Sequence, residues 1–371
     1  THQVTARTTG QVRIVGAGLL GASLGHVLTG LGIDVILHDA SRTELAIAID
    51  YGAGRRAADD DDPTVVVVAV PPDATASVVA AELAAWPRAT VTDVASVKAG
   101  ILADLEAAGA DLTPYVGSHP MAGRERGGAI AARADLFLGR PWVLAPAPTA
   151  AADGLWAVEN IAADAGAIPI IMPAAEHDAA VALVSHVPQV IASALAARLR
   201  GAVPEAVSLA GGGLRDTTRI AESDPALWVQ ILGANATPVA AILREIRSDL
   251  DAAITALDDP DAPGARRAIA DLLAAGNAGV ASIPGKHGRT ERFTSITLLI
   301  DDRPGELARL LTEIGVLGVN MEDLRFEHSP SAQVGLVEIL IVPEAEATLT
   351  DALLERGWRI VTYGKSACAF S

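Results

Sequence analysis

The sequence predicts an α/β fold: a Rossmann-type doubly wound sheet, followed by an all-helical dimerisation domain and a small α+β domain. Three observations support this. A glycine fingerprint follows a short apolar run near the start, strand and helix signals alternate as far as residue 173, and long amphipathic helical patterns replace them afterwards. With 371 residues the chain is also longer than one ordinary domain.

The first strand is predicted at Val12–Val15, which leads directly into the glycines. Thr64–Val70 is an almost continuous valine run, typical of a strand buried on both faces of a parallel sheet. Ser41 and Glu44 have the spacing of a capping box, in which hydroxyl and carboxylate each satisfy a free backbone N–H group at a helix start. Further strands are predicted at 34–37, 90–92 and 168–172, and helices at 19–31, 42–51 and 74–85.

After Pro173 a helical period dominates the sequence. Its broad apolar faces are of the kind that a second chain covers, so we expect a homodimer. Helices are predicted at 175–200, 225–257 and 265–280. A breaker-rich polar segment then leads to a strand at 293–300, a helix from Asp302, a strand at 334–342 and a helix at 345–356.

These patterns divide the chain into five segments. The predicted segments are a disordered tail at 1–11, a dinucleotide-binding domain at 12–173, a helical dimerisation and substrate domain at 174–281, a linker at 282–291 and a small α+β domain at 292–371.

Composition excludes several classes of function. A net charge of −17 argues against a nucleic-acid partner, because nothing compensates phosphate repulsion. The single cysteine, Cys368, excludes an intrachain disulfide and a thiolate metal cluster, and no metal site is predicted. We find no apolar run of the roughly 20 residues that span a bilayer, and no signal-peptide stretch at the start. A cytoplasmic protein without a membrane partner is therefore expected.

The glycine fingerprint predicts a dinucleotide site because it follows a strand and opens a helix. Gly16 permits the tight turn, Gly18 lets the backbone approach a pyrophosphate, and Gly21 allows close packing of helix on sheet. The helix start offers free N–H donors to the phosphates. A glycine-rich turn without a ligand is the alternative. The remaining predicted cofactor contacts are Leu19, Leu20, Val70 and Pro71.

Asp39 favours NAD as the cofactor. It ends the second predicted strand, 18 residues after Gly21, where a carboxylate can accept both ribose hydroxyls and would repel a 2′-phosphate. Arg42 could still neutralise such a phosphate, so NADP is not excluded.

His119 is the candidate base. It lies in a predicted loop, Gly117–Gly123, on the carboxyl side of the sheet, where ligands bind in such folds. A fixed imidazole beside a nicotinamide suggests oxidation of an alcohol. Ser96 follows another strand on the same edge, and its hydroxyl could orient His119 or the substrate, or simply cap the next helix. Lys98 is expected to be a solvated helix residue.

Arg219 is the candidate anion-binding residue. It follows a triple-glycine turn in an acidic chain, and a guanidinium there can hold a carboxylate through paired charge-assisted bonds. A salt bridge to Asp216 or Glu222 is equally compatible with the spacing.

From about Val12 to Leu257 these segments resemble the prephenate/arogenate dehydrogenase family of tyrosine biosynthesis. The resemblance rests on several motifs in combination. They are the fingerprint with Ser23 after it, Ser96-Val97-Lys98, His119-Pro120-Met121-Ala122-Gly123, His177-Asp178, Ser185-His186-Val187-Pro188, and Gly211 through Trp228 with its core at 216–221.

The resemblance implies roles for individual residues. His119 would be the catalytic histidine that contacts the ring hydroxyl, assisted by Ser96, and Arg219 would bind a substrate carboxylate. The residues implied to shape the pocket are Ser185, Asp216 and Trp228. The linker residues implied to approach an anionic ligand, unless the linker is only a solvated hinge, are Lys286, His287 and Arg289.

Two positions depart from the family pattern. Gln189 stands where some members carry a histidine that helps to recognise the substrate, so the choice between a keto and an amino side chain stays open. Arg124 replaces a small hydroxyl residue after the loop glycine, and its extra cation could bind a second carboxylate or reach the cofactor.

The last part of the chain resembles an ACT domain, the amino-acid-sensing module of many biosynthetic enzymes. The matching residues are 302–307 and Gly318-Val319-Asn320. The resemblance implies binding of tyrosine, or another aromatic amino acid, as an effector near Pro304 and Gly305, with Asn320 contributing.

The activity implied is prephenate dehydrogenase: NAD-dependent oxidative decarboxylation of prephenate to 4-hydroxyphenylpyruvate, with feedback by tyrosine. Three alternatives stay open: arogenate dehydrogenase, which would form tyrosine directly, another hydroxy-acid dehydrogenase on the same plan, and a non-catalytic amino-acid sensor. The enzymatic interpretation requires His119 and Arg219 to converge beside the dinucleotide.

Overall fold

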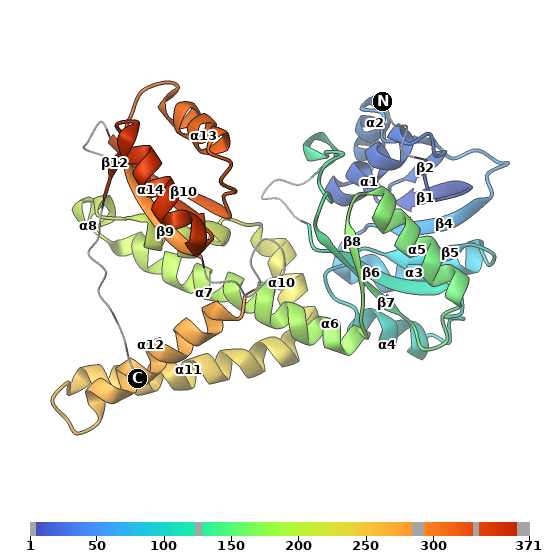
Figure 1. Ribbon diagram of the computed structural model, residues 1–371. Helices are drawn as coiled ribbons and strands as arrows, with labels where there is room; N and C mark the ends of the chain where they lie inside the picture. The colour runs from blue at the N-terminus through green and yellow to red at the C-terminus, as the bar shows by residue number, and fades with distance from the viewer. Residues whose placement is uncertain (1–4, 123–127, 284–292, 329–333, 362–371) are drawn as a thin grey trace. The chain divides into compact units, whose positions relative to one another are not determined.

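The computed structural model describes residues 5–122, 128–283, 293–328 and 334–361. The chain forms two compact units, 1–247 and 248–371, and each is considered by itself. The expected fold class is confirmed: a nucleotide-binding α/β sheet, a helical segment, and a small antiparallel sheet with helices (Figure 1).

The first unit contains an eight-stranded sheet of order β3-β2-β1-β4-β5-β6-β7-β8. All neighbours pair in parallel except β6 and β7, which are antiparallel. Because the strand order reverses between β1 and β4, the carboxyl ends of these two strands form the switch point where ligands bind in such sheets. The strands are β1 Gln11–Val15, β2 Val35–His38, β3 Arg55–Arg56, β4 Pro63–Val68, β5 Thr90–Asp93, β6 Tyr115–Pro120, β7 Pro141–Pro146 and β8 Ile168–Ile171.

Helices cover both faces of this sheet. Leu24 and Leu28 of α1 and Val158 of α5 pack with alternate residues of the central strands, whereas Val79 of α3 and Ile101 of α4 pack on the opposite face. Burial on both sides explains the unbroken valine run of β4. The helices are α1 Leu19–Gly30, α2 Arg42–Asp50, α3 Pro72–Ala85, α4 Ala99–Ala107 and α5 Ala152–Asp164.

The predicted capping box is only half formed. The Ser41 hydroxyl accepts a hydrogen bond from Glu44 N at 3.2 Å and caps α2 as expected. The Glu44 carboxylate does not return to Ser41. It accepts from the backbone N–H of Ala129 instead, at 3.0 Å, and so ties α2 to a distant segment, while Ser41 N donates to Asp39.

The helical part departs from the prediction in two places. The predicted helix 225–257 breaks at Asn235, where α10 Pro225–Ala234 and α11 Ala236–Asp258 meet at 95°. The predicted helix 175–200 continues over 28 residues, Ala174–Gly201, but its middle is a π-helical turn, Ala182–His186 (η2). The helices around these breaks are α6 Ala174–Val181, α7 Val187–Ala196, η3 Ala197–Gly201, α8 Pro204–Ser208, α9 Gly212–Thr218, η4 Arg219–Ala221 and α12 Ala265–Ala281.

The run Ala174–Gly201 is long and apolar enough to cross a membrane by length and composition, with a third of its most apolar window buried. The prediction that no stretch reaches that length is therefore wrong. Length alone is weak evidence for a span, because core helices of soluble proteins reach it too.

The second unit contains a four-stranded antiparallel sheet of order β10-β11-β9-β12. In chain order its elements run βαββαβ, the ferredoxin-like arrangement. The strands β10 and β12 were not predicted, since one is rich in charge and the other has two residues. The elements are β9 Thr294–Asp301, α13 Glu306–Val316, β10 Asp323–His328, β11 Val334–Ile341, α14 Glu346–Glu355 and β12 Arg359–Ile360.

Candidate active site

The glycine fingerprint forms a tight passage between β1 and α1 at the switch point. Gly16 has φ +104°, and a Cβ atom there would collide with the carbonyl oxygen of Ala69 after β4. A Cβ atom on Gly21 would collide with the carbonyl oxygen of Gly16. Gly18 instead faces open space, and a Cβ atom there would meet nothing within 4 Å. Gly16 and Gly21 therefore serve packing, whereas Gly18 leaves room for a ligand.

The start of α1 suits phosphate groups. Its N-cap, Gly18, provides no side-chain hydrogen bond, and its first turn contains no acidic residue. The helix therefore presents free N–H donors and its positive dipole end without an acidic side chain in its own first turn. Leu19 and Leu20 begin this helix and are half-buried, whereas Val70 and Pro71 follow β4 on the other side of the switch point.

Asp39 follows β2 and is held beside the glycine passage. Its carboxylate accepts hydrogen bonds from Ala17 N and Ser41 N, each at 2.6 Å. These bonds orient the carboxylate at the end of the strand next to β1, the position from which it can reach a ribose. The residues present thus fit a dinucleotide.

His119 is the second-last residue of β6 rather than part of a loop, so the predicted loop 117–123 is wrong for its first four residues. The antiparallel pairing with β7 sets His119 opposite Val143, which fixes its backbone. Its Nδ1 atom lies 2.8 Å from Nε2 of His177 in α6. Burial, reinforced by the nearby His177, holds the pKa of His119 well below the ordinary value of 6.5. The imidazole is therefore neutral and able to accept a proton.

His177 is fully buried and bonds in turn to Asp178, with 2.8 Å between Nδ1 and Oδ1. The Asp178 carboxylate also accepts the backbone N–H groups of Lys98 and Ala99, each at 2.8 Å. Burial works to raise the pKa of Asp178, but the bonds from His177 and the two backbone groups outweigh it, and the pKa lies below its ordinary value. Asp178 is thus an ionised anchor behind the histidine pair.

Lys98 is buried, so the prediction of a solvated side chain is wrong. Its ammonium group forms an ion pair with Asp93 and donates to the Ser118 carbonyl oxygen at 2.7 Å. Tyr115 donates its hydroxyl to the other Asp93 oxygen at 2.7 Å. Burial lowers the pKa of Lys98, while Asp93 acts against this. Lys98 is the N-cap of α4, and its side chain turns inward to the carboxylate of Asp93 at the end of β5.

Ser96 is half-buried between β5 and α4. It does not cap the helix, since Lys98 occupies that position. Among the described residues the hydrogen-bond partner of His119 is His177, so the orientation of the imidazole comes from α6 rather than from Ser96.

Asn235, at the break between α10 and α11, connects the helical residues to this cluster. Its buried amide nitrogen donates to the Asp178 carbonyl oxygen at 2.8 Å and lies 3.0 Å from His186 Nδ1. His186 packs edge-on against Trp228, with 6.0 Å between ring centres. A continuous set of contacts therefore runs from Trp228 to His119, although the sequence pattern did not single out Asn235. The helix break at a polar residue was the available signal.

The other predicted substrate residues lie around α7. Arg219 begins η4, which packs against α7; it is exposed, and within the described parts of the chain it pairs with neither Asp216 nor Glu222 and contacts neither histidine of the pair. Asp216 is exposed, and Ser185 is half-buried in the π-helical turn. Gln189 donates to Ser223 Oγ at 2.8 Å, which ties α7 to the segment after η4.

The remaining predicted residues lie outside the described parts of the chain or in the second unit. Arg124, Lys286, His287 and Arg289 lie outside the described residues. Pro304 and Gly305 are exposed just before α13, where Gly305 has φ +92°, and Asn320 is exposed between α13 and β10.

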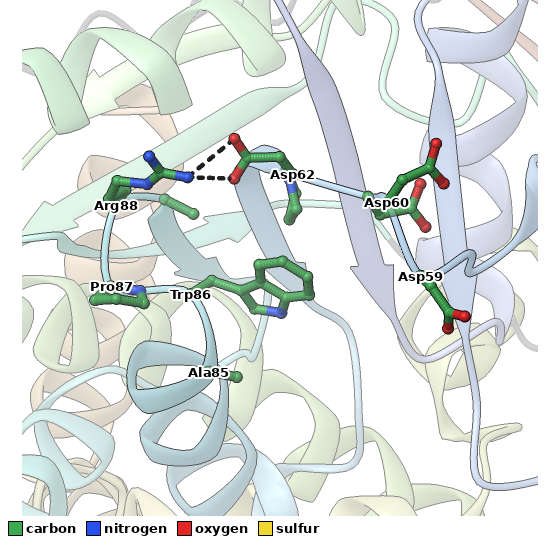
Figure 2. A pocket seen from close by; sticks show the side chains of 10 residues that line it. Asp59, Asp60, Asp62, Ala85, Trp86, Pro87 and Arg88 are labelled. Atoms are coloured by element: carbon green, nitrogen blue, oxygen red, sulfur yellow. Dashed lines mark hydrogen bonds and ion pairs between the residues drawn. The ribbon is translucent and has the colours of Figure 1, made fainter.

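A separate pocket lies away from this site. A hollow of about 460 Å³ is lined by residues 59–63 and 85–89, which precede β4 and β5, so it lies at the amino ends of the strands, opposite the glycine passage. Figure 2 shows Arg88 reaching Asp62 across it, at 3.0 Å, beside further aspartates. This acidic lining does not suit a phosphate-bearing cofactor.

Comparisons with known proteins match most of the chain to one family. Residues 27–171 match the nucleotide-binding domain of prephenate dehydrogenase, and residues 173–271 match the dimerization domain of the same enzymes. The probable prephenate dehydrogenase NovF of Streptomyces niveus is 36% identical over 355 residues, covering 93% of this chain and 98% of that protein.

Two solved structures are similar over most of their length. The prephenate dehydrogenase of Aquifex aeolicus, in complex with hydroxyphenyl propionate and NAD⁺, has a TM-score of 0.64 at 26% identity, covering 74% of this chain and 99% of that one. Synechocystis arogenate dehydrogenase has a TM-score of 0.61 at 26% identity, covering 72% of this chain and 99% of that one.

Proposed function

This chain belongs to the prephenate dehydrogenase family, and we propose that it converts prephenate and NAD⁺ to 4-hydroxyphenylpyruvate, carbon dioxide and NADH in tyrosine biosynthesis. The observation that carries the proposal is the neutral His119, held at the carboxyl edge of a sheet whose switch point fits a dinucleotide. NAD⁺ is favoured because Asp39 stands where a 2′-phosphate would meet a carboxylate.

The chemistry requires a hydride acceptor, a base and an anchor for the carboxylates. NAD⁺, when bound, accepts the hydride from C4 of the cyclohexadienol ring. His119 takes the hydroxyl proton through Nε2, because Nδ1 is engaged by His177. The ring then loses its carboxylate as carbon dioxide and becomes aromatic, which makes the step irreversible. Alignment supplies most of what the protein adds, and a general base contributes about 10²–10⁴-fold.

Arg219 is the proposed carboxylate anchor. Its guanidinium is exposed and free of ion pairs to described residues, as a ligand-binding cation must be before substrate arrives. Ser96 lies on the same sheet edge as His119 and is proposed to bond the substrate hydroxyl. The residues proposed to line the rest of the pocket are Ser185, Gln189, Asp216, Trp228 and Arg124.

Arogenate is the second candidate substrate. The similarity to an arogenate dehydrogenase favours it, and Gln189 offers both a donor and an acceptor for a keto or an amino side chain.

We further propose a homodimer and amino-acid regulation. The helical segment matches a dimerization domain and exposes large apolar side chains, so a second copy is the partner that fits them. The βαββαβ order of the second unit supports an ACT domain, with tyrosine as effector at Pro304, Gly305 and Asn320. A soluble cytoplasmic enzyme would follow from the family, because its substrate and cofactor are water-soluble.

One assay tests these proposals together. Purified protein is mixed with NAD⁺ or NADP⁺ and either prephenate or arogenate, and the fluorescence of the reduced cofactor is followed with and without tyrosine. We expect prephenate-dependent reduction of NAD⁺ that tyrosine lowers. A chain that reduces neither cofactor with either substrate would not be this enzyme. Activity with arogenate alone would make arogenate, not prephenate, the substrate.

A further inference from the structure

Two side chains behind His119 have no role in the proposed function. His177 is fully buried, touches His119 on one side and Asp178 on the other, and forms a chain of two 2.8 Å contacts. His177 therefore does more than fill space in the core. Each of its ring nitrogens contacts a titratable side chain, the candidate base on one side and an anchored carboxylate on the other.

Two proton arrangements fit this chain, and they differ in whether His177 carries one ring proton or two. Asp178 is ionised and therefore accepts only, so the proton between it and His177 sits on His177 Nδ1. In the arrangement with a single proton on the His177 ring, Nε2 is bare and can only accept. The proton in the contact between the two histidines must accordingly sit on His119 Nδ1. This leaves the lone pair of His119 on Nε2, which has no hydrogen-bond partner among the described residues.

We propose that His177 and Asp178 are positioning residues that hold His119 in the tautomer with a bare Nε2. The inference rests on the proposed function. During turnover one proton passes from the substrate hydroxyl to His119 Nε2, and the hydride leaves for the cofactor. The positive charge stays on the His119 ring, whose Nδ1–H continues to donate to His177. Asp178 stabilises that charge through the same chain and does not itself take up the proton.

Asp178 is suited to this role by its other contacts. The two backbone N–H groups at the start of α4 donate to its two carboxylate oxygens, and the Asn235 amide donates to its backbone carbonyl oxygen. The start of α4 therefore fixes the carboxylate of Asp178, Asn235 fixes its backbone, and through Asp178 both fix the His177 imidazole.

A matched pair of variants separates this role from simple packing. In His177→Gln the side-chain oxygen replaces Nε2 as acceptor for His119, whereas in His177→Asn the side-chain nitrogen replaces Nδ1 and bonds Asp178 without reaching His119. We expect His177→Asn to lower kcat about 100-fold, as misplaced catalytic groups do. His177→Gln should stay within about 10-fold of the wild type. Thermal melting and NAD⁺ binding of the full chain verify that both variants fold.

The outcomes are decisive in either direction. Equal loss in both folded variants would assign His177 to structure alone, and normal turnover in both would remove it from the mechanism. Because Asn could also prevent folding, a second measurement uses the wild type only. In protein labelled with ¹⁵N-histidine, NMR should find the His119 proton on Nδ1, with the signal assigned by its loss in His119→Gln.

A proton on His119 Nε2 in that spectrum would overturn the proposal whatever the activity. Conversely, NMR could find the proton on Nδ1 in a protein that does not turn over prephenate. In that case the positioning role of His177 and Asp178 would stand and the proposed function would be rejected. The two ideas therefore fail separately.

Discussion

Replacing Lys98 by methionine should destabilise the first unit severely, although lysine is ordinarily a surface residue. The Lys98 side chain is 1% exposed, and its ammonium group pairs with the carboxylate of Asp93, whose side chain is 0% exposed. Removing one partner of such a pair leaves a buried charge uncompensated, which costs about 3–5 kcal/mol. Among the described residues, the Asp93 carboxylate would retain the Tyr115 hydroxyl and the Ala95 N–H, neither of which carries a charge.

The matched control is Arg88→Met. Arg88 pairs with Asp62 on the surface, with side chains 83% and 69% exposed. Exposed pairs of this kind contribute less than about 1 kcal/mol. Lys98→Met should therefore lower the free energy of unfolding several-fold more than Arg88→Met, because only the first pair is buried. A second control, the double variant Lys98→Met/Asp93→Asn, removes both charges and should recover more than half of the loss.

The measurement is guanidinium denaturation followed by tryptophan fluorescence and circular dichroism, comparing transition midpoints and slopes between variants. Trp142 lies fully buried in β7 of the affected sheet and provides a local probe. If Lys98→Met shifted the midpoint no further than Arg88→Met, the reasoning about the buried pair would be refuted.

Four further predictions concern the site. His119→Gln should lower kcat about 10²–10⁴-fold with NAD⁺ affinity unchanged in a binding titration, since only the base is lost; near-normal turnover would remove His119 from the chemistry. Arg219→Ala should chiefly raise KM for prephenate, because charge-assisted bonds are worth about 1.5–3 kcal/mol; an unchanged KM would leave the arginine a surface role. The pKa of His119 is lowered and the neutral ring is the active form, so kcat/KM should stay level as pH falls through 6.5 and drop only in more acid solution; a loss centred at or above 6.5 would contradict the burial argument. Asn235→Ala should cost about 2–4 kcal/mol in a thermal melt, because the Asp178 carbonyl and His186 Nδ1 lose their donor; a stability change within about 0.5 kcal/mol would show that water replaces the amide.

Much of the fold could be predicted because local chemistry and tertiary structure agree there. The valine run became β4, the glycine passage lies where a strand meets a helix, and the alternating pattern before Pro173 gave the sheet. The predictions failed where a polar side chain found a distant partner. The Glu44 carboxylate accepts from Ala129 N instead of from the start of its own helix. Asn235 interrupts an otherwise periodic helix, and its amide bonds groups on α6 and η2.

The sequence by itself determined the fold class, the dinucleotide passage and the identity of the candidate base, because these depend on residue type and short spacing. Tertiary structure alone decided how His119 is held and where Lys98 goes. His177 lies 58 residues from His119, and nothing in the spacing joins them. Only the packing of α6 against the sheet edge brings the two imidazoles and a carboxylate into line, because burial makes every unpaired polar atom costly and so selects this arrangement.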